Sequence, residues 1–124
     1  MRDLSVSEAQ IMWEVWSREE DVSVPDLTEI LFQKYGKEHK PSTMRTFLGR
    51  LIEKKYISTY RIGRYSYVHA EVTERQYRGM LAQREVKQWY GGSLFEFVSC
   101  FREAGEISEE EGKRLKELIN ELED

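Results

Sequence analysis

Arginine, serine and threonine side chains recur between residues 42 and 53 at spacings that place them on one face of a helix. This face carries Ser42, Arg45, Thr46, Gly49, Arg50 and Glu53. Arginine can bond guanine through two hydrogen bonds, and threonine can offer a hydroxyl to a base or a methyl group to thymine. The amino terminus of the same helix favours phosphate. The chemistry that these residues could perform is therefore recognition of DNA bases and phosphates.

The surrounding charge supports the same interpretation. Residues 34–64 hold nine lysines and arginines against two glutamates, a net charge of +7. The whole chain has a net charge of −4, because residues 71–124 hold 8 basic against 13 acidic residues. A basic stretch of this kind is the electrostatic footprint of a protein that binds a phosphate backbone. The acidic total therefore does not exclude nucleic acid as a partner.

Other reactive side chains give no comparable pattern. Cys100 is the single cysteine, so it forms no internal disulfide, and pairing it with His39 or His69 as nucleophile and base has no support from spacing. A cysteine beside apolar residues of a helix is far more often a small packing residue. Two histidines and one cysteine give no recognisable zinc spacing. We expect no enzyme activity, no metal and no cofactor.

The length of 124 residues allows one domain, or a small domain with a helical appendage. Charged residues near the amino terminus break up any apolar core of a signal peptide, so no secretory signal is expected. No apolar run approaches the roughly 20 residues of a membrane span. We expect a cytoplasmic protein without membrane insertion.

Three helices and a hairpin should position the basic face. Ser5 and Glu8 have the spacing of a capping box for a first helix that should end near Arg18. Ser23 should cap a second helix, with Gly36 after its end. A third helix is expected over about residues 42–55, with its buried face formed by Met44, Phe47, Leu48, Leu51 and Ile52. Two strands, residues 57–62 and 65–70, should follow as a hairpin around Gly63 and Arg64.

After residue 72 the pattern is purely helical. Three helices should start at Thr73, Ser93 and Ser108, each with a glutamine or glutamate three residues later. The last two carry apolar stripes that nothing else in the chain can cover, so we expect a second copy to cover them in a C2 dimer. The predicted dimerisation residues are Leu94, Phe97, Val98, Phe101, Leu115, Leu118, Ile119 and Leu122.

The predicted fold class is mainly α with a small β-hairpin wing (α+β). Residues 1–71 should form a winged helix-turn-helix DNA-binding domain, and residues 72–124 a helical dimerisation segment. The predicted DNA-binding residues are Ser42, Thr43, Arg45, Thr46, Arg50, Lys54, Lys55, Arg61 and Arg64.

Several segments together resemble the BlaI/MecI/CopY family of bacterial penicillinase repressors. Residues 43–51, Thr-Met-Arg-Thr-Phe-Leu-Gly-Arg-Leu, with Lys54 and Lys55 after them, are similar to the recognition helix of the family. Residues 90–94, Tyr-Gly-Gly-Ser-Leu, resemble the start of its dimerisation segment. The resemblance implies a repressor that dimerises through its C-terminal helices and binds a palindromic operator over a promoter, where it occludes RNA polymerase.

The sequence departs from the family at three points, the first of them at a cleavage switch that the resemblance implies. In penicillinase-type members a membrane sensor-protease cuts an Asn-Phe bond, and the matching positions here are Cys100 and Phe101, without the asparagine. Copper-responsive members carry paired cysteines near the C-terminus, and none follows Cys100, so copper sensing of that type is not expected. Lys40 stands where the family usually has a capping serine, so we expect Ser42 to provide the cap.

Two functions remain open from the sequence. The first is a homodimeric, sequence-specific transcriptional repressor on double-stranded DNA. The alternative is a protein-protein adaptor that uses the winged-helix scaffold, with its basic face on an acidic partner. Only the first demands a steep dependence of DNA affinity on salt.

Overall fold

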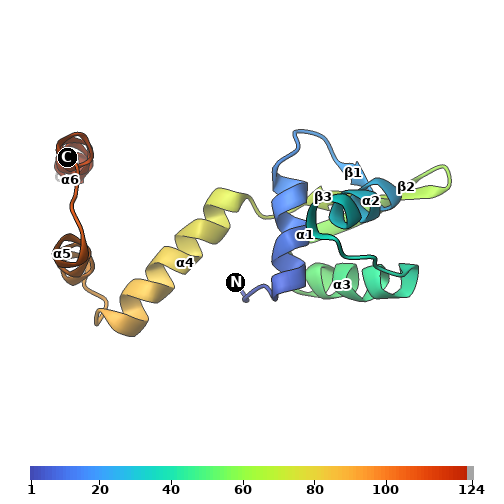
Figure 1. Ribbon diagram of the computed structural model, residues 1–124, viewed down its shortest axis with the longest axis horizontal. Coiled ribbons are helices and arrows are strands. Elements are labelled where there is room, and N and C mark those ends of the chain that lie inside the picture. Colours follow the sequence, from blue (N-terminus) through green and yellow to red (C-terminus); the bar gives the residue numbers. More distant parts are fainter. Residues whose placement is uncertain (123–124) are drawn as a thin grey trace. The chain divides into compact units, whose positions relative to one another are not determined.

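The computed structural model describes residues 1–122, which form six helices and three strands (Figure 1). The chain divides into two compact units, Met1–Met80 and Leu81–Asp124. No helix within residues 1–122 is long and apolar enough to cross a membrane. In chain order the elements are α1 (Val6–Trp16), β1 (Val22–Ser23), α2 (Val24–Tyr35), α3 (Pro41–Glu53), β2 (Ile57–Ile62), β3 (Tyr65–Ala70), α4 (Glu74–Trp89), α5 (Leu94–Ala104) and α6 (Glu109–Glu121).

The first two helices begin where the capping residues predict. The Ser5 hydroxyl accepts from the Glu8 N–H at 3.2 Å, and the Glu8 carboxylate accepts from the Ser5 N–H at 2.8 Å, which completes the capping box of α1. Helix α1 ends at Trp16, slightly before the expected Arg18. The Ser23 hydroxyl caps α2, and Gly36 ends it in the left-handed conformation at φ 65°.

Helix α3 differs at both ends from the expectation. It begins at Pro41 with Lys40 at the cap position, so the prediction that Ser42 caps it is wrong: the fixed φ of proline suits the first helical position. At its other end Lys55 takes a left-handed φ of 69°, and the Tyr56 N–H bonds the Leu51 carbonyl at 2.9 Å. This is the hydrogen bond that closes a Schellman motif, in a position where glycine is the usual residue.

The predicted hairpin is present, and its strands have the predicted bounds. Strands β2 and β3 pair antiparallel from Ile57 opposite Ala70 to Ile62 opposite Tyr65, and Gly63 turns between them at φ 63°. The short strand β1 adds to the other edge of β3, giving the order β1-β3-β2. Strand β1 has only two residues, which are too few to show an alternating pattern in the sequence, and it was not predicted.

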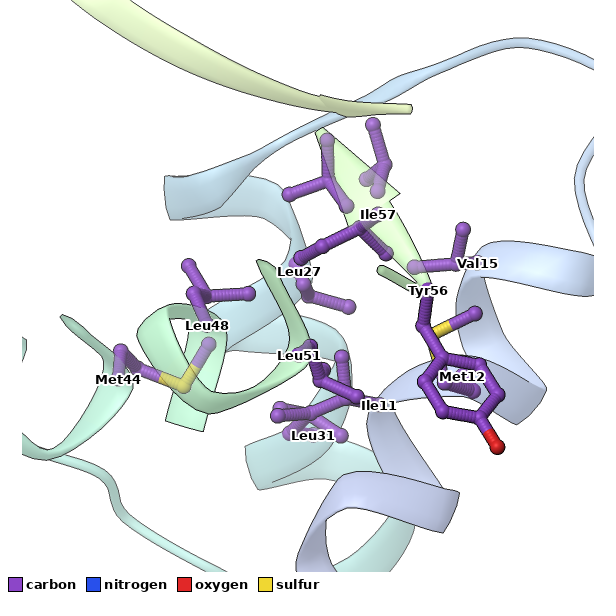
Figure 2. Close-up of a cluster of buried hydrophobic side chains, with 12 residues drawn as sticks. Ile11, Met12, Val15, Leu27, Leu31, Met44, Leu48, Leu51, Tyr56 and Ile57 are labelled. Carbon is purple, nitrogen blue, oxygen red and sulfur yellow. The ribbon is translucent and has the colours of Figure 1, made fainter. Parts of the chain in front are cut away.

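The core of the first unit lies between its three helices and the sheet (Figure 2). Ile11 of α1, Leu31 of α2 and Leu51 of α3 are each about 1% exposed or less. Two members of the predicted apolar face of α3 lie outside the buried set: Ile52 is 43% exposed, and Phe47 is half-buried. The apolar stripe of α3 is therefore narrower than its periodicity predicts, and Ile52 lies at its edge. The buried apolar set is Ile11, Met12, Val15, Val22, Leu27, Leu31, Met44, Leu48, Leu51, Tyr56, Ile57 and Val68.

The start of α4 belongs to the first unit. The Trp16 indole donates to the Val72 carbonyl at 2.7 Å, and the Tyr77 ring packs edge-on against Trp16 with centroids 5.7 Å apart. The two units consequently divide inside α4, between Met80 and Leu81, and not after residue 71.

The second unit contains the remainder of α4 with α5 and α6. Ser93 and Ser108 cap α5 and α6 through bonds to the backbone N–H groups three residues later, as predicted. None of the described residues of α5 and α6 is fully buried. The unit therefore has helices with formed caps but no enclosed core of its own.

Candidate nucleic-acid interface

The exposed face of α3 presents the side chains that the sequence predicts. Arg45, Thr46 and Arg50 are exposed, as is Ser42 at the start of the helix, while Thr43 is half-buried. The Thr46 hydroxyl donates to the Ser42 carbonyl at 3.1 Å, so its methyl group and oxygen lone pairs remain for a ligand. The face is set by the burial of Met44, Leu48 and Leu51 on the opposite side of the helix (Figure 2).

The amino terminus of α3 carries no side-chain cap. Lys40 occupies the cap position without a side-chain hydrogen bond, whereas α1 and α2 are both capped by serines. The first N–H groups of a helix have no intrahelical partner, and the helix dipole gives them a positive potential. This end of α3 can therefore accept a phosphate oxygen without displacing a protein group.

The wing carries the other two predicted arginines. Arg61 lies on β2 and Arg64 follows Gly63 in the turn, and both are exposed. One nitrogen of the Arg61 guanidinium donates to the Arg64 carbonyl at 3.2 Å, which ties the two residues together across the turn. The hairpin projects beyond the three helices of its unit (Figure 1). Its tip is accordingly placed to meet a ligand that also contacts α3.

Two lysines of the basic stretch form ion pairs with buried glutamates of α1. Lys54 donates to the Glu8 carboxylate at 2.6 Å and to the Asp3 carbonyl at 2.8 Å, and its side chain is only 16% exposed. Lys34 bonds Glu14 at 2.9 Å. The structure therefore does not bring Lys54 to the face that Arg45 and Arg50 share, and we leave it out of the interface.

The buried carboxylates show why these lysines matter to the fold. Burial alone would raise the pKa of Glu8, but bonds from Lys54 and from the backbone and hydroxyl of Ser5 outweigh it and lower the pKa. The pKa of Glu14 is lowered in the same way, by Lys34, Tyr35 and Arg18 acting against burial. Both glutamates are consequently charged at neutral pH and hold α1 to its neighbours.

The other seven cations of the stretch form no ion pair with any residue among 1–122. Lys55, the remaining predicted contact on the α3 side, is exposed. A guanidinium or ammonium group without an ion-pair partner keeps its donors available for phosphate, and among these groups only Arg61 uses one nitrogen within residues 1–122, for the bond to the Arg64 carbonyl. The seven are Lys37, Lys40, Arg45, Arg50, Lys55, Arg61 and Arg64.

The carboxylate of Asp21, which was not among the predicted site residues, connects the wing to the segment before β1. Asp21 accepts from the Tyr60 hydroxyl at 2.6 Å and lies 2.9 Å from the His69 ring. The bonds from Tyr60 and His69 lower the pKa of Asp21, and the same contact raises the pKa of His69. Residues so far apart in the chain carry no local signal of this contact. The cluster fixes both wing strands beside β1.

The residues considered for other chemistry are dispersed. Cys100 is exposed on α5, in the second unit, whereas His69 bonds Asp21 in the first. Within residues 1–122 no three histidine, cysteine or acidic side chains are grouped as a metal site. Phe101 is 59% exposed beside Cys100, and the peptide bond between them lies within helix α5.

The predicted dimerisation residues are exposed or half-buried. Leu94, Leu118 and Leu122 are 60%, 56% and 76% exposed. Between α5 and α6 lies an apolar hollow of about 220 Å³, lined by Phe97, Val98, Phe101, Ile107, Glu111 and Leu115. The second unit thus exposes apolar side chains on both α5 and α6.

Three helices followed by a small antiparallel sheet, with an exposed basic third helix and arginines on a projecting hairpin, define a winged-helix DNA-binding domain. The sequence model of the penicillinase repressor family matches residues 4–121, and the chain therefore belongs to this family. It is 25% identical over 120 residues to the penicillinase repressor of Staphylococcus aureus, covering 97% of this chain and 93% of that protein.

Membership of the family has direct consequences for the predictions from sequence. The predicted family and α+β winged-helix fold class are confirmed. The family consists of DNA-binding transcriptional repressors and not of enzymes, so the chain is a DNA-binding transcriptional repressor.

Proposed function

We propose that the chain represses transcription as a homodimer that binds a palindromic DNA operator in the cytoplasm. The observation that carries the proposal is the separation of charges in the first unit. Lys34 and Lys54 are used to neutralise buried glutamates, while Arg45, Arg50 and Arg64 face outward without protein partners within residues 1–122. Unpaired arginines on a helix and an adjacent wing are suited to contact bases and backbone together.

In this proposal α3 enters the major groove. Arg45, Thr46 and Arg50 read base edges, Ser42 and Thr43 lie by phosphates at the amino terminus of the helix, and Arg61 and Arg64 hold the flanking backbone. Lys55 contacts phosphate. The apolar residues of α5 and α6 join two copies, so the spacing of two half-sites follows from the dimer. Occlusion of RNA polymerase at the promoter then explains repression.

A membrane sensor-protease that cuts between Cys100 and Phe101 is a further part of the proposal. The bond lies within α5, so a protease needs the helix to open locally before its backbone can enter an active site. Removing α6 from the chain would separate the two apolar helices and weaken dimerisation. Incubation of the protein with cells that are being induced, followed by mass determination of its fragments, tests this step. A chain that stays whole while repression is relieved rules it out.

The base-reading face is tested by alanine substitutions. Arg45→Ala and Thr46→Ala should weaken binding to the operator more than to random DNA, by about 1 to 3 kcal/mol for a bidentate base contact. Lys55→Ala should weaken binding to both DNAs equally, because phosphate carries no sequence information. Fluorescence anisotropy at two salt concentrations measures both effects, with an operator taken from selection on genomic fragments.

The outcome separates the proposal from its alternative. Equal losses on operator and random DNA for all three variants contradict the assignment of the base-reading face. Absence of an enriched palindrome and of any salt dependence would favour the adaptor, in which the basic face of α3 binds an acidic protein surface.

A further inference from the structure

The segment before β1 is bonded to both strands of the wing through one side chain. Asp21 accepts from the Tyr60 hydroxyl of β2 at 2.6 Å, and its other carboxylate oxygen lies 2.9 Å from Nδ1 of His69 on β3. The bond to Tyr60 reaches past β3, because β1 pairs only with β3 in the sheet order β1-β3-β2. Asp21 therefore connects the edge of the sheet at β1 directly to the opposite edge strand.

The wing is packed into the core at its base. Ile57 and Val68 are 2% exposed or less, whereas residues 59–67, which include the tip, are exposed or half-buried. Strand β1 supports the hairpin through two residue pairs, Val22 with Val68 and Ser23 with Tyr67. A two-stranded hairpin is marginally stable by itself in water. The orientation of the outer half of the wing therefore depends on side-chain bonds such as those of Asp21.

The bond to Tyr60 acts on the strand position next to Arg61. Successive side chains of a strand point to opposite faces, so Tyr60 and Arg61 lie on opposite faces of β2. Tyr60 is on the face of Asp21, where its ring also stacks on Tyr67 with centroids 5.7 Å apart. Arg61 pairs with Ser66, which lines the hollow between α3 and the wing. Fixing Tyr60 on one face therefore holds Arg61 on the face that adjoins α3.

The charge of Asp21 has two opposing effects on a DNA-binding unit. Bonds from Tyr60 and His69 lower the pKa of Asp21, so its carboxylate is charged at neutral pH. A negative charge repels the phosphate backbone, and its removal should by itself tighten DNA binding. A hydrogen bond to an ionised acceptor is, however, stronger than one between neutral groups. The charge therefore strengthens the two bonds to the wing while it opposes the DNA directly.

We propose that Asp21 is a positioning residue for DNA binding, which holds the wing in the orientation that brings its arginines to the DNA backbone. It acts through Tyr60 and His69 and touches no DNA itself. The inference rests on the proposed function, because it requires Arg61 and Arg64 to contact DNA. It predicts that loss of the carboxylate weakens DNA binding, whereas the charge alone predicts the reverse.

Asp21→Ala tests this sign. It should weaken binding to operator and random DNA alike by roughly fivefold, the effect of one ordinary hydrogen bond on an equilibrium constant, because the wing contacts backbone and not bases. It should also reduce the salt slope by up to about 2, one unit for each wing arginine. Fluorescence anisotropy at several salt concentrations measures both quantities.

The matched control is Glu20→Ala, which removes the neighbouring carboxylate. Glu20 is exposed, and among residues 1–122 it bonds no residue of the wing. Its loss should leave the affinity unchanged or raise it slightly. A loss of affinity in Asp21→Ala that is absent in Glu20→Ala supports the inference.

Two further variants separate the bond from the charge. Tyr60→Phe removes the hydroxyl that bonds Asp21 and keeps the ring that stacks on Tyr67, so it should weaken binding in the same direction. Asp21→Asn retains an acceptor oxygen for Tyr60 without the charge, and it should recover part of the affinity lost in Asp21→Ala. Circular dichroism on heating verifies that each variant is folded, and Tyr60→Phe decides the question if Asp21→Ala is not.

A double-mutant cycle shows whether Asp21 acts through the wing arginines. Arg61→Gln together with Arg64→Gln removes both cations, and in this background Asp21→Ala should have little further effect. A fivefold loss that persists in this background overturns the inference, as does an affinity that Asp21→Ala alone leaves unchanged or raises. If the arginine substitutions themselves leave the affinity unchanged, the wing does not contact DNA, and that part of the proposed function fails together with the inference.

Discussion

The two units of the chain use apolar residues in opposite ways. In the first unit, side chains from α1, α2, α3 and the sheet meet in one core, and Met12, Leu27 and Leu51 are almost fully enclosed (Figure 2). In the second unit, α5 and α6 have comparable amphipathic stripes, yet Phe101, Ile119 and Leu122 are more than half exposed. Amphipathic helices of this length are marginal in water without a packed face. The first unit is complete as one chain, whereas the second requires a further surface.

Charges follow the same division. The first unit pairs its buried glutamates internally and exposes unpaired cations on α3 and the wing. Residues 81–124 carry 6 basic against 11 acidic residues, a net charge of −5. An acidic segment is repelled by a phosphate backbone. The first unit thus exposes unpaired cations, whereas the second combines an acidic surplus with exposed apolar stripes.

The largest effect is expected from a charge placed on the apolar face of α6. Leu118→Asp should dissociate the dimer, because a carboxylate would have to lose its water in an apolar interface. Loss of the second half-site contact should weaken operator binding by about 1,000-fold, the gain that linking two binding modules typically provides. Sedimentation equilibrium measures the first effect and fluorescence anisotropy the second.

Asn120→Asp provides the control for this change. It introduces the same carboxylate on the same helix, but on the side opposite the apolar stripe, and Asn120 is exposed. It should leave both the dimer and the affinity unchanged. If the wild-type protein sediments as a monomer at concentrations far above those needed for DNA binding, the apolar stripes of α5 and α6 do not join two copies.

A smaller effect is expected from breaking the ion pair between Lys54 and Glu8 in the first unit. Lys54→Met should destabilise the fold by about 3 kcal/mol, because it leaves the Glu8 carboxylate buried without its cation. Glu8 is 1% exposed, and its Oε2 atom already has no hydrogen-bond partner within residues 1–122. Lys55→Met changes the adjacent, exposed lysine and should have little effect on stability. Urea denaturation followed by circular dichroism measures both.

The pH dependence of the stability difference between wild type and Lys54→Met distinguishes a lost charge pair from lost packing. The pKa of Glu8 is lowered below its ordinary value of 4.5, so its contribution to stability is present above that value and is lost as the pH falls through the lower pKa of the folded state. In Lys54→Met burial raises the pKa of Glu8, and the carboxyl takes up its proton more readily. The stability difference between the two proteins should therefore narrow on acidification. A difference that stays constant down to pH 3 contradicts the role of the charge.

Local sequence signals were sufficient for the elements of this fold. Ser5 with Glu8, Ser23 with Gly36, and Gly63 between two β-rich runs each specify a structure within a few residues. Strand β1 and the division inside α4 depend on contacts across the chain, such as the Trp16 bond to Val72. Such contacts leave no periodic pattern in the sequence.

The candidate site shows the same limit. Its exposed members follow from the helical period of α3, since the buried Met44 and Leu48 set the opposite face. The period could not reveal that Lys54 bonds Glu8, 46 residues away, because a lysine in a basic stretch has the same sequence signature whether it is paired or free. For the same reason the helical period predicted that Ile52 is buried, although its side chain is 43% exposed.

The smallest effect is expected from replacing two glycines, one inside α3 and one inside α4. Gly49→Ala and Gly79→Ala each add a methyl group that meets no protein atom within 4 Å, in α3 and α4 respectively. Each should raise the free energy of unfolding by up to about 1 kcal/mol, because alanine restricts the unfolded chain and favours the helix. Urea denaturation measures this gain.

DNA binding should separate the two variants even though their stabilities change alike. If a DNA strand approaches the backbone of α3, the new methyl at residue 49 occupies the space between them, and affinity for operator and random DNA should fall together. Gly79 lies on α4, away from the basic residues of α3 and the wing in the sequence, so its variant should bind as tightly as wild type. Equal affinities for the two variants would falsify the close approach at Gly49, since nothing else in the surroundings of that residue opposes a side chain.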